Sequence, residues 1–557
     1  MAGDTTKNNN NNKTDSTQAG VHPFVILCSI VASMGTFNAG INTSALNIPG
    51  YFVRNCPNAD PGEVTYFPET VLPECIPMND FVWGIATGMF ALGGLVGGII
   101  AGHLAEYTGR RDTMFIINST FFIGAILMGP ATTSVMFIIG RIFVGIGSGS
   151  MSVLVSMYIA EIAPPKQRGM LVGLLQLFAT CGFLVIELCG LGLQSAIGWH
   201  ISSVITVIPA LLQIILLPFC VRSPRWLVNQ NRVDEAYKAL SKLRQGDIDV
   251  EFNDMTHFSS SSSRNTGKNV DYNTSFTLSP PSLSSSINNG STIITYQQQS
   301  NYQQQSYNSI YKNKQSLTLT LSPPLPAEEE TKEGESLSLI QLMRIPVLAK
   351  FTLKMISLHT GFQLCGILAI MYYSTSIFQT TFDRNYAAYV TVGVSGVFVI
   401  FTMIGLILVD RLGRKALILF SSVTMCISCI LMTVALIFDK SIFQVVCIML
   451  FVATFAVGLG ICPFLFASES FPTYAIGAGC SAALMSNWFF NFAIGLLFPT
   501  LMKALDVYVF VPFAVVTLLL AIFTYFFTVE TACKSIDEIG RELGWYDLEP
   551  KKFLQKT

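Results

Sequence analysis

Charged residues are scarce in this chain. Only 12% of its 557 residues are Asp, Glu, Lys or Arg, about half the share found in a typical soluble domain. Hydrophobic residues make up 51% of the sequence, and the mean hydropathy is +0.52. So little charge leaves too few polar side chains to cover the apolar ones in water. A soluble globular class is therefore excluded, and a membrane protein is predicted.

An excess of one charge sign is also missing. The net charge is −1, which argues against a nucleic-acid partner. The sequence has no phosphate-binding loop, metal-ligand cluster or nucleophile elbow, so nothing indicates an enzyme, a cofactor or a metal. Its 13 cysteines are scattered. Cys426 and Cys429 lie within an apolar run without a second ligand pair, and we interpret them as buried packing residues.

Long apolar stretches are what the sequence has instead. A membrane-spanning helix needs about 20 apolar residues, and twelve stretches satisfy this requirement. They lie near residues 24–46, 81–103, 113–131, 135–158, 170–193, 200–221, 347–378, 386–409, 416–438, 442–467, 478–502 and 507–528. The stretch 347–378 is too long for one straight helix, so Gly361 and Gly366 are expected to break or bend it.

The chain contains an internal repeat. Residues 102–111 (GHLAEYTGRR) return as residues 405–415 (GLILVDRLGRK), and an acid that follows each segment also repeats, as Glu161 and Glu469. Such duplication is typical of transporters built from two similar halves. Gly102 and Gly405 are expected to allow close helix packing. The arginines of each repeat are expected to reach the repeated acids and to form a latch on one side of the membrane.

The predicted organisation is all-α, with two six-helix halves joined by cytoplasmic segments. Basic residues in the short loops place both termini in the cytoplasm. Cys56 and Cys75 then share the extracytoplasmic loop, where a disulfide and two free thiols both remain open. The predicted parts are a disordered tail (1–20), an N-terminal half (21–221), a cytoplasmic helix (222–246), a disordered linker (247–335), a C-terminal half (336–529) and a cytoplasmic tail (530–557).

Several motifs together resemble the sugar porter family of the major facilitator superfamily, which includes the facilitative glucose transporters. The matching segments are residues 109–111, 140–141 with 145, 158–161, 167–169, 223–225, 372–378, 410–415, 469 with 471–472, and 486–488. The resemblance implies a twelve-helix fold and a cytoplasmic charge network. Its members here would be Arg110, Arg111, Arg141, Glu161, Arg168, Arg225, Asp410, Arg414 and Glu469.

The resemblance also implies where a sugar binds. Gln176 matches a glutamine on the fifth span of the family, and Gln363 matches the second of two adjacent glutamines on the seventh. Asn487 and Asn491 lie one turn apart on the eleventh span and share a face. Trp488, Asn42 and Tyr373 complete the predicted contacts. For each polar residue the alternative is a hydrogen bond between helices.

The sequence departs from the family pattern at positions that are usually polar or acidic. In the C-terminal half they carry Phe362, Leu368, Phe398 and Ala456, and Phe464 replaces the usual aromatic residue. A drier, more apolar wall is therefore expected on the C-terminal side of the site. The latch departs as well, with Tyr107, Arg222 and Ile476 at positions where the family has an arginine, a glutamate and an arginine, respectively.

Three functions remain open at this point. The prediction is a facilitative transporter of a monosaccharide, a hexose such as glucose, because Asn42 stands where proton-coupled relatives carry an aspartate. Glu187 and His359 motivate the alternative of a proton-coupled sugar or polyol symporter. The lost polar contacts motivate a sugar sensor that does not transport. The expected partners are the sugar and the lipid bilayer, with the oligomeric state open. The plasma membrane is the expected location, and an endosomal or vacuolar membrane is the alternative.

Overall fold

The structure, a computed structural model, describes residues 22–256 and 337–548, apart from residues 57–62, 165, 166, 247, 254, 473, 533, 535 and 547. All of the described residues up to 256 and from 337 onward belong to one compact unit of the chain. The predicted tail 1–20, most of the predicted linker 247–335 and the last residues of the predicted tail 530–557 lie outside the described residues.

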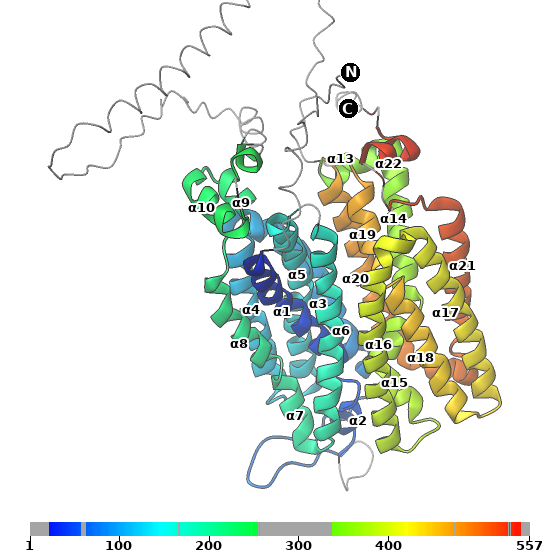
Figure 1. Cartoon of the computed structure of the whole chain (residues 1–557). Helices are drawn as coiled ribbons and strands as arrows, with labels where there is room; N and C mark the ends of the chain where they lie inside the picture. Colours follow the sequence, from blue (N-terminus) through cyan, green and yellow to red (C-terminus); the bar gives the residue numbers. More distant parts are fainter. Residues whose placement is uncertain are drawn as a thin grey trace, which may run out of the picture. The chain divides into compact units, whose positions relative to one another are not determined.

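Two successive groups of long helices form this unit (Figure 1). The N-terminal half contains α1 (Pro23–Ser44), α2 (Gly50–Arg54), α3 (Asp80–Thr108), α4 (Arg110–Met128), α5 (Ser134–Ile162), α6 (Arg168–Gly192), α7 (Ala196–Val204) and α8 (Val207–Leu216). The C-terminal half contains α14 (Pro346–Leu364), α15 (Ile367–Phe378), α16 (Arg384–Leu412), α17 (Arg414–Ile437), α18 (Ser441–Val457), α19 (Cys462–Ser470), α20 (Ile476–Leu505) and α21 (Val511–Phe527). Short helices outside the spans are α9 (Pro224–Asn229), α10 (Val233–Leu243), α13 (Leu339–Arg344) and α22 (Ile536–Leu543).

The spans confirm the predicted fold class. In the described part of the chain, 11 helical segments are long and apolar enough to cross a membrane, and the shorter apolar helix Val511–Phe527 occupies the place of the twelfth. The break expected in the stretch 347–378 lies at Gly366, which has φ +102° and separates α14 from α15. A break that the sequence analysis missed separates α7 from α8. Pro209 explains it, because proline has no N–H to donate to the carbonyl of Ile205.

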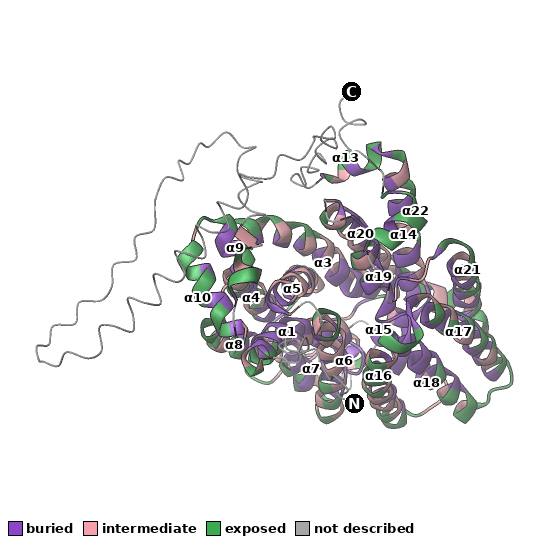
Figure 2. Ribbon diagram, turned by 45° about the horizontal axis from the view of Figure 1, so that its top comes forward, coloured by how far each residue is buried: buried purple, intermediate pink, exposed green. Residues whose placement is uncertain are grey.

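The halves meet along two helix pairs that the duplication relates to each other. Helix α3 packs on α20, and α6 packs on α16. The first contact is very close, since a Cβ atom on Gly84 would lie 2.3 Å from the carbonyl oxygen of Leu496. Figure 2 shows buried residues on the faces that the helices turn toward one another. A Cβ atom on Gly405 would lie 2.9 Å from Ala456 O, so this glycine also packs closely. A Cβ atom on Gly102 would have no neighbouring helix within 4 Å among the described residues, so the close contact expected there is wrong.

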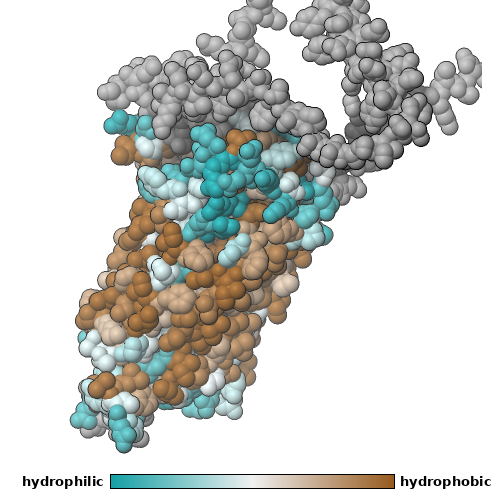
Figure 3. Space-filling model, turned by 90° about the vertical axis from the view of Figure 1, so that its left-hand side faces the viewer, coloured by the Kyte–Doolittle hydropathy of each residue, from teal (hydrophilic) through white to brown (hydrophobic). Residues whose placement is uncertain are grey.

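The outward faces of the helices are apolar over a broad belt. Figure 3 shows this belt below a hydrophilic band on the face formed around α4, α8 and α10. Ile126 of α4 is 67% exposed and Ile208 of α8 is 66% exposed. Exposed apolar patches of this extent are stable only against lipid, which agrees with the multi-pass membrane topology.

The repeated Gly-Arg corners adopt the same backbone conformation in both halves. Gly109 has φ 85° and ψ 154°, and Gly413 has φ 86° and ψ 162°. This region of backbone space is nearly exclusive to glycine. The arginine that follows each glycine donates back to the preceding helix, from Arg110 to Ala105 O at 3.1 Å and from Arg414 to Val409 O at 3.2 Å. The sequence repeat is therefore a structural repeat.

Replacing Gly413 by alanine is expected to lower the free energy of unfolding by about 1–3 kcal/mol, the usual cost of holding a residue with a side chain in this backbone region. The new Cβ atom would also lie 2.5 Å from a carboxylate oxygen of Glu530. Thermal unfolding of the detergent-purified protein measures the effect. Gly477→Ala is the matched control, because Gly477 lies in helix α20 and a Cβ atom there would have no atom of the described residues within 4 Å beyond its own helix backbone. Equal melting temperatures for the two variants would contradict the prediction.

Candidate functional site

Two buried amides meet next to the break in the seventh span. Gln363 lies in the last turn of α14, and its Nε2 donates to Oδ1 of Asn487 on α20 at 2.6 Å. Gln363 Oε1 and Asn487 Nδ2 of the same two amides are buried without a hydrogen-bond partner among the described residues, as is Nε1 of Trp488, the next residue of α20. Buried polar groups are nearly always hydrogen-bonded. An acceptor and two donors are thus available to a polar ligand here.

Trp488 brings this group to the boundary between the halves. Its ring lies 6.1 Å from that of Phe90 on α3, centroid to centroid, so the C-terminal tryptophan packs on the N-terminal half. Asn491, one turn further along α20, accepts a hydrogen bond at 2.7 Å from the hydroxyl of Tyr372. The two asparagines therefore share a face, as the spacing predicts, and the second is held by a tyrosine of α15.

The other predicted sugar contacts have different surroundings. Gln176 is half-buried on α6, and none of the hydrogen bonds found within the described residues involves its side chain. Asn42 donates to Thr206 Oγ1 at 2.7 Å, inside the N-terminal half. Tyr373 donates to the carbonyl oxygen of Gly495 at 2.7 Å. Tyr373 thus makes the hydrogen bond between helices that the sequence analysis gave as the alternative, and Asn42 bonds to the break between α7 and α8.

Most of the aromatic residues that depart from the family pattern gather in one cluster. Phe362 lies 5.4 Å from Phe455 and 5.6 Å from Phe464, and Phe398 lies 5.9 Å from Phe455, all between ring centroids. Phe183 of α6 stacks on Phe398 at 5.7 Å and carries the cluster across to the N-terminal half. His359 borders it, 5.1 Å from the ring of Phe464. Phe362 of this cluster directly precedes Gln363 in α14.

On the extracytoplasmic side, hydrogen bonds join the two halves. Glu187 of α6 is 2% exposed. Its carboxylate accepts from Asn47 Nδ2 at 3.0 Å and from the hydroxyl of Ser395 on α16. Asn47 also donates to Ser374 Oγ at 2.8 Å and accepts from the backbone N–H of Thr375 at 3.0 Å. We call Asn47, Glu187, Ser374, Thr375 and Ser395 the outer joint.

Two further features support the outer side. The guanidinium of Arg384, on the C-terminal half, lies 3.7 Å from the ring centroid of Tyr51, on the N-terminal half. Cys56 and Cys75 are joined by a disulfide with a Cα–Cα distance of 4.9 Å, which answers the question that the sequence left open. The disulfide closes the loop that follows α2.

On the cytoplasmic side, the ion pairs of the repeat stay within each half. Arg110 pairs with Glu161 at 2.9 Å, and Arg414 pairs with Glu469 at 2.9 Å and with Asp410 at 3.3 Å. Among the described residues, every ion pair on the cytoplasmic side joins two residues of the same half, and so does Arg54–Asp80 on the outer side. Of the ion pairs in this part of the chain, only Lys503–Asp80, also on the outer side, connects the two halves. The described conformation is therefore joined at its outer side.

Four other arginines of the predicted network do not pair with Glu161 or Glu469. The prediction that Arg141 belongs to the cytoplasmic network is wrong. Arg141 lies about 30 Å along α5 from Glu161, and its guanidinium donates to Asn42 O at 2.8 Å. Arg111 pairs with Asp112 at 2.8 Å. Arg168 and Arg225 are exposed and have no carboxylate within ion-pair distance in the described part of the chain.

Glu530 is a member of this side that the sequence analysis did not identify. Its carboxylate accepts from the backbone N–H groups of Arg414 at 2.8 Å and Lys415 at 3.0 Å, and so caps the start of α17. Thr531 donates to Glu469 at 2.7 Å and links this cap to the ion pairs. Burial by itself would raise the pKa of Glu530, but the hydrogen bonds from backbone N–H groups outweigh it and lower the pKa below the usual value. A glutamate directly after an apolar span was the available signal.

Glu530→Gln is expected to destabilise the protein by about 0.5–2 kcal/mol at neutral pH, the usual cost of losing a helix cap. The lowered pKa means that the native carboxylate stabilises the fold at neutral pH and loses this effect as the pH falls through the lowered value. The difference in melting temperature between the native chain and the variant should therefore shrink on acidification. Glu106→Gln, at an exposed position of α3, is the control. A constant difference from pH 7 to pH 3 would oppose this assignment.

Comparisons with known proteins show which proteins this chain is similar to. A family model described as "Sugar (and other) transporter" matches residues 24–310 and 295–543. The chain is 31% identical over 543 residues to the facilitated glucose transporter member 3 of solute carrier family 2 from Oryctolagus cuniculus, covering 96% of this chain and 95% of that one. It is 31% identical over 539 residues to member 4 from Homo sapiens, covering 93% and 90%.

Solved structures share the fold at lower sequence identity. The proton:xylose symporter XylE bound to 6-bromo-6-deoxy-D-glucose superposes with a TM-score of 0.66 at 21% identity, covering 94% of this chain and 99% of that one. A partially occluded inward open conformation of the xylose transporter XylE from E. coli gives a TM-score of 0.64 at 20% identity, covering 92% and 100%. The coverage of this chain means that the similarity extends over both halves.

Proposed function

The chain belongs to the sugar transporter family of the major facilitator superfamily, and on this premise we propose that it carries a hexose such as glucose across the membrane by facilitated diffusion. The relatives named above are facilitated glucose transporters that match over nearly their whole length. Their names describe the movement of glucose rather than its conversion, so we propose that this chain is a carrier and not an enzyme.

The amide group at Gln363 and Asn487 supports this proposal most directly. A sugar hydroxyl both donates and accepts hydrogen bonds, and Gln363 Oε1, Asn487 Nδ2 and Trp488 Nε1 offer one acceptor and two donors to it. The indole and the neighbouring aromatic rings provide apolar faces for the C–H groups of a pyranose ring. Gln176 would contact the sugar from the N-terminal half.

The outer joint and the cytoplasmic ion pairs suggest how transport proceeds. In the described conformation, hydrogen bonds from Asn47 and Ser395 connect the halves at the outer side. Alternating access requires a second conformation in which these bonds separate and the cytoplasmic ends of the halves approach each other. The ion pairs Arg110–Glu161 and Arg414–Glu469 would keep each cytoplasmic end rigid during this movement. A sugar that binds the closed intermediate better than either open state lowers the barrier.

Sugar uptake by the purified, full-length protein in proteoliposomes tests the proposal. The measurement is saturable uptake of radiolabelled glucose, with and without an imposed pH gradient, alongside Gln176→Ala. Gradient-independent flux that is lost in the variant supports facilitated diffusion of glucose. Without glucose flux, a panel of other hexoses, pentoses and polyols comes next, since the cluster of Phe362 and Phe398 replaces polar contacts that the family usually has. A chain that binds but never carries any of them would be a sensor.

A proton-coupled symporter is the second candidate, because of Glu187. This carboxylate is buried in the outer joint and accepts hydrogen bonds from both halves. A proton that binds it would weaken one of these bonds, which would link protonation to the separation of the halves. Accumulation of sugar above its external concentration, only when the pH gradient is present, would favour this candidate over facilitated diffusion.

A further inference from the structure

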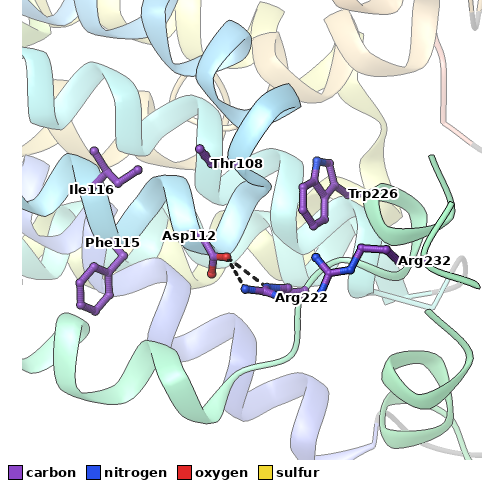
Figure 4. A pocket seen from close by; sticks show the side chains of 7 residues that line it. All are labelled: Thr108, Asp112, Phe115, Ile116, Arg222, Trp226 and Arg232. Carbon is purple, nitrogen blue, oxygen red and sulfur yellow. Dashed lines mark hydrogen bonds and ion pairs between the residues drawn. The ribbon is translucent and has the colours of Figure 1, made fainter. Parts of the chain in front are cut away.

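A cavity of about 500 Å³ lies at the cytoplasmic edge of the N-terminal half, away from the amide group. Asp112, Phe115 and Ile116 of α4 line one side of it, and Trp226 of α9 lines another (Figure 4). Arg222 and Arg232, which flank α9 in sequence, and Thr108 at the end of α3 complete the lining. None of these residues has a part in the proposed sugar pathway.

The cavity opens where the apolar belt of the protein begins. Phe115 and Ile116 are 46% and 47% exposed, on the second turn of α4, and so face the lipid. Trp226 Nε1 donates to the carbonyl oxygen of Glu106 at 3.0 Å, which fixes α9 against the end of α3. One wall is therefore apolar and lipid-facing, and the other belongs to the cytoplasmic helices.

Guanidinium groups outnumber carboxylates around this cavity. Arg111 and Arg222 share Asp112, at 2.8 Å each, and Arg232 pairs with Glu235 at 2.6 Å. Arg222 Nη1 is 4.0 Å from Glu235, too far for a hydrogen bond, and Arg232 donates through Nε and Nη2. Within the described part of the chain, each of the two lining arginines thus keeps N–H groups for another acceptor. Arg222 also stands where the sugar porter pattern has a glutamate, so the positive charge is a feature of this chain.

We propose that the cavity binds the phosphate headgroup of an anionic phospholipid from the cytoplasmic leaflet. Arg222 and Arg232 donate to the phosphate oxygens, because the planar guanidinium suits phosphate geometry. The acyl chains lie along Phe115 and Ile116. A soluble phosphate compound would leave this apolar wall uncovered, whereas a lipid satisfies both walls. Anionic lipids also attract basic residues near the cytoplasmic membrane surface. The bound lipid ties the segment containing α9 and α10 to the leaflet.

Native mass spectrometry of the delipidated full-length protein tests this site. Phosphatidylglycerol and phosphatidylcholine are added at equal concentration, and the ratio of bound anionic to zwitterionic lipid is measured. The native chain should prefer phosphatidylglycerol, and the double variant Arg222→Gln, Arg232→Gln should lower this preference about tenfold. Lys242→Gln removes an exposed positive charge on the same cytoplasmic helices, at the end of α10, and should leave the ratio unchanged.

Three outcomes would overturn the proposal. The double variant could keep the preference of the native chain, or Lys242→Gln could lose it to the same extent. Inorganic phosphate at the lipid concentration could displace phosphatidylglycerol, which would make this a site for free phosphate. If the double variant does not fold, the same lipid ratio is measured for Arg232→Gln alone, and an unchanged ratio overturns the proposal. The Arg232 side chain is 38% exposed, so its loss is not expected to disturb packing. Lipid binding is measured without sugar, so the result is independent of the transport proposal.

Discussion

The Asn487→Ala variant is expected to need about 5- to 150-fold more hexose than the native chain for half-maximal uptake, at a normal level of protein in the membrane. The substitution removes one proposed sugar donor and leaves Gln363 Nε2 without the acceptor that it contacts at 2.6 Å. An unpaired buried polar group costs about 1–3 kcal/mol, and each 1.4 kcal/mol corresponds to a tenfold change in affinity. Initial uptake rates in proteoliposomes over a range of sugar concentrations measure the change.

The chain contains a matched control for this experiment. Asn118 of α4 donates to the side-chain oxygen of Gln213 of α8 at 3.0 Å, an amide pair of the same chemistry within the N-terminal half. Asn118→Ala should lower the melting temperature without a specific change in the sugar concentration for half-maximal uptake. Equal losses of apparent affinity in both variants would mean that Asn487 acts through stability and is no sugar contact.

Replacing Glu187 is expected to open the outer side of the transporter. Glu187→Ala leaves the donors Asn47 Nδ2 and Ser395 Oγ without the acceptor that joins them across the halves. Asn47 Nδ2 keeps Ser374 Oγ as an acceptor at 2.8 Å, so Ser395 Oγ is the donor left unpaired. An unpaired buried donor costs about 1–3 kcal/mol, which shifts a two-state equilibrium about 5- to 150-fold toward the other conformation. Distances between spin labels at Ile197 and Tyr386, which are exposed on opposite halves near the outer side, should then include a longer population. The labels are attached to cysteines introduced at these two positions, so the native free cysteines that react with the label are replaced first.

Two variants separate the gating role of Glu187 from proton coupling. Ser395→Ala removes only one donor and should give a smaller shift in the same direction. Glu187→Gln keeps the volume and one acceptor, so a facilitator with this substitution still transports in both directions. Should Glu187 carry a proton, this variant would lose only the accumulation that the pH gradient drives. An unchanged distance distribution in Glu187→Ala would refute the outer joint as a gate.

Several features of the site were accessible from the sequence because they depend on local spacing. The one-turn spacing of Asn487 and Asn491 places them on one face of a helix, and the structure has this arrangement. The repeated motif placed Arg110 and Arg414 at equivalent corners, next to Glu161 and Glu469. Arg141 shows the limit of such reasoning. It belongs to a family motif, but its distance along α5 from Glu161 separates it from the cytoplasmic side.

The sequence by itself determined the membrane class, the twelve spans, the duplication and the family, because these follow from composition, from periodicity and from motifs that are contiguous in the chain. Only the tertiary structure decided which polar groups meet. Glu187 contacts Ser395 across 208 residues of sequence, and Arg414 reaches Glu530 across 116. The tertiary structure also decided that Asn42 donates to Thr206, between α7 and α8, and that Tyr373 donates to Gly495 of α20. Such contacts depend on how the helices pack and rotate against one another, and helix rotation within an almost uniformly apolar segment leaves little trace in the local sequence.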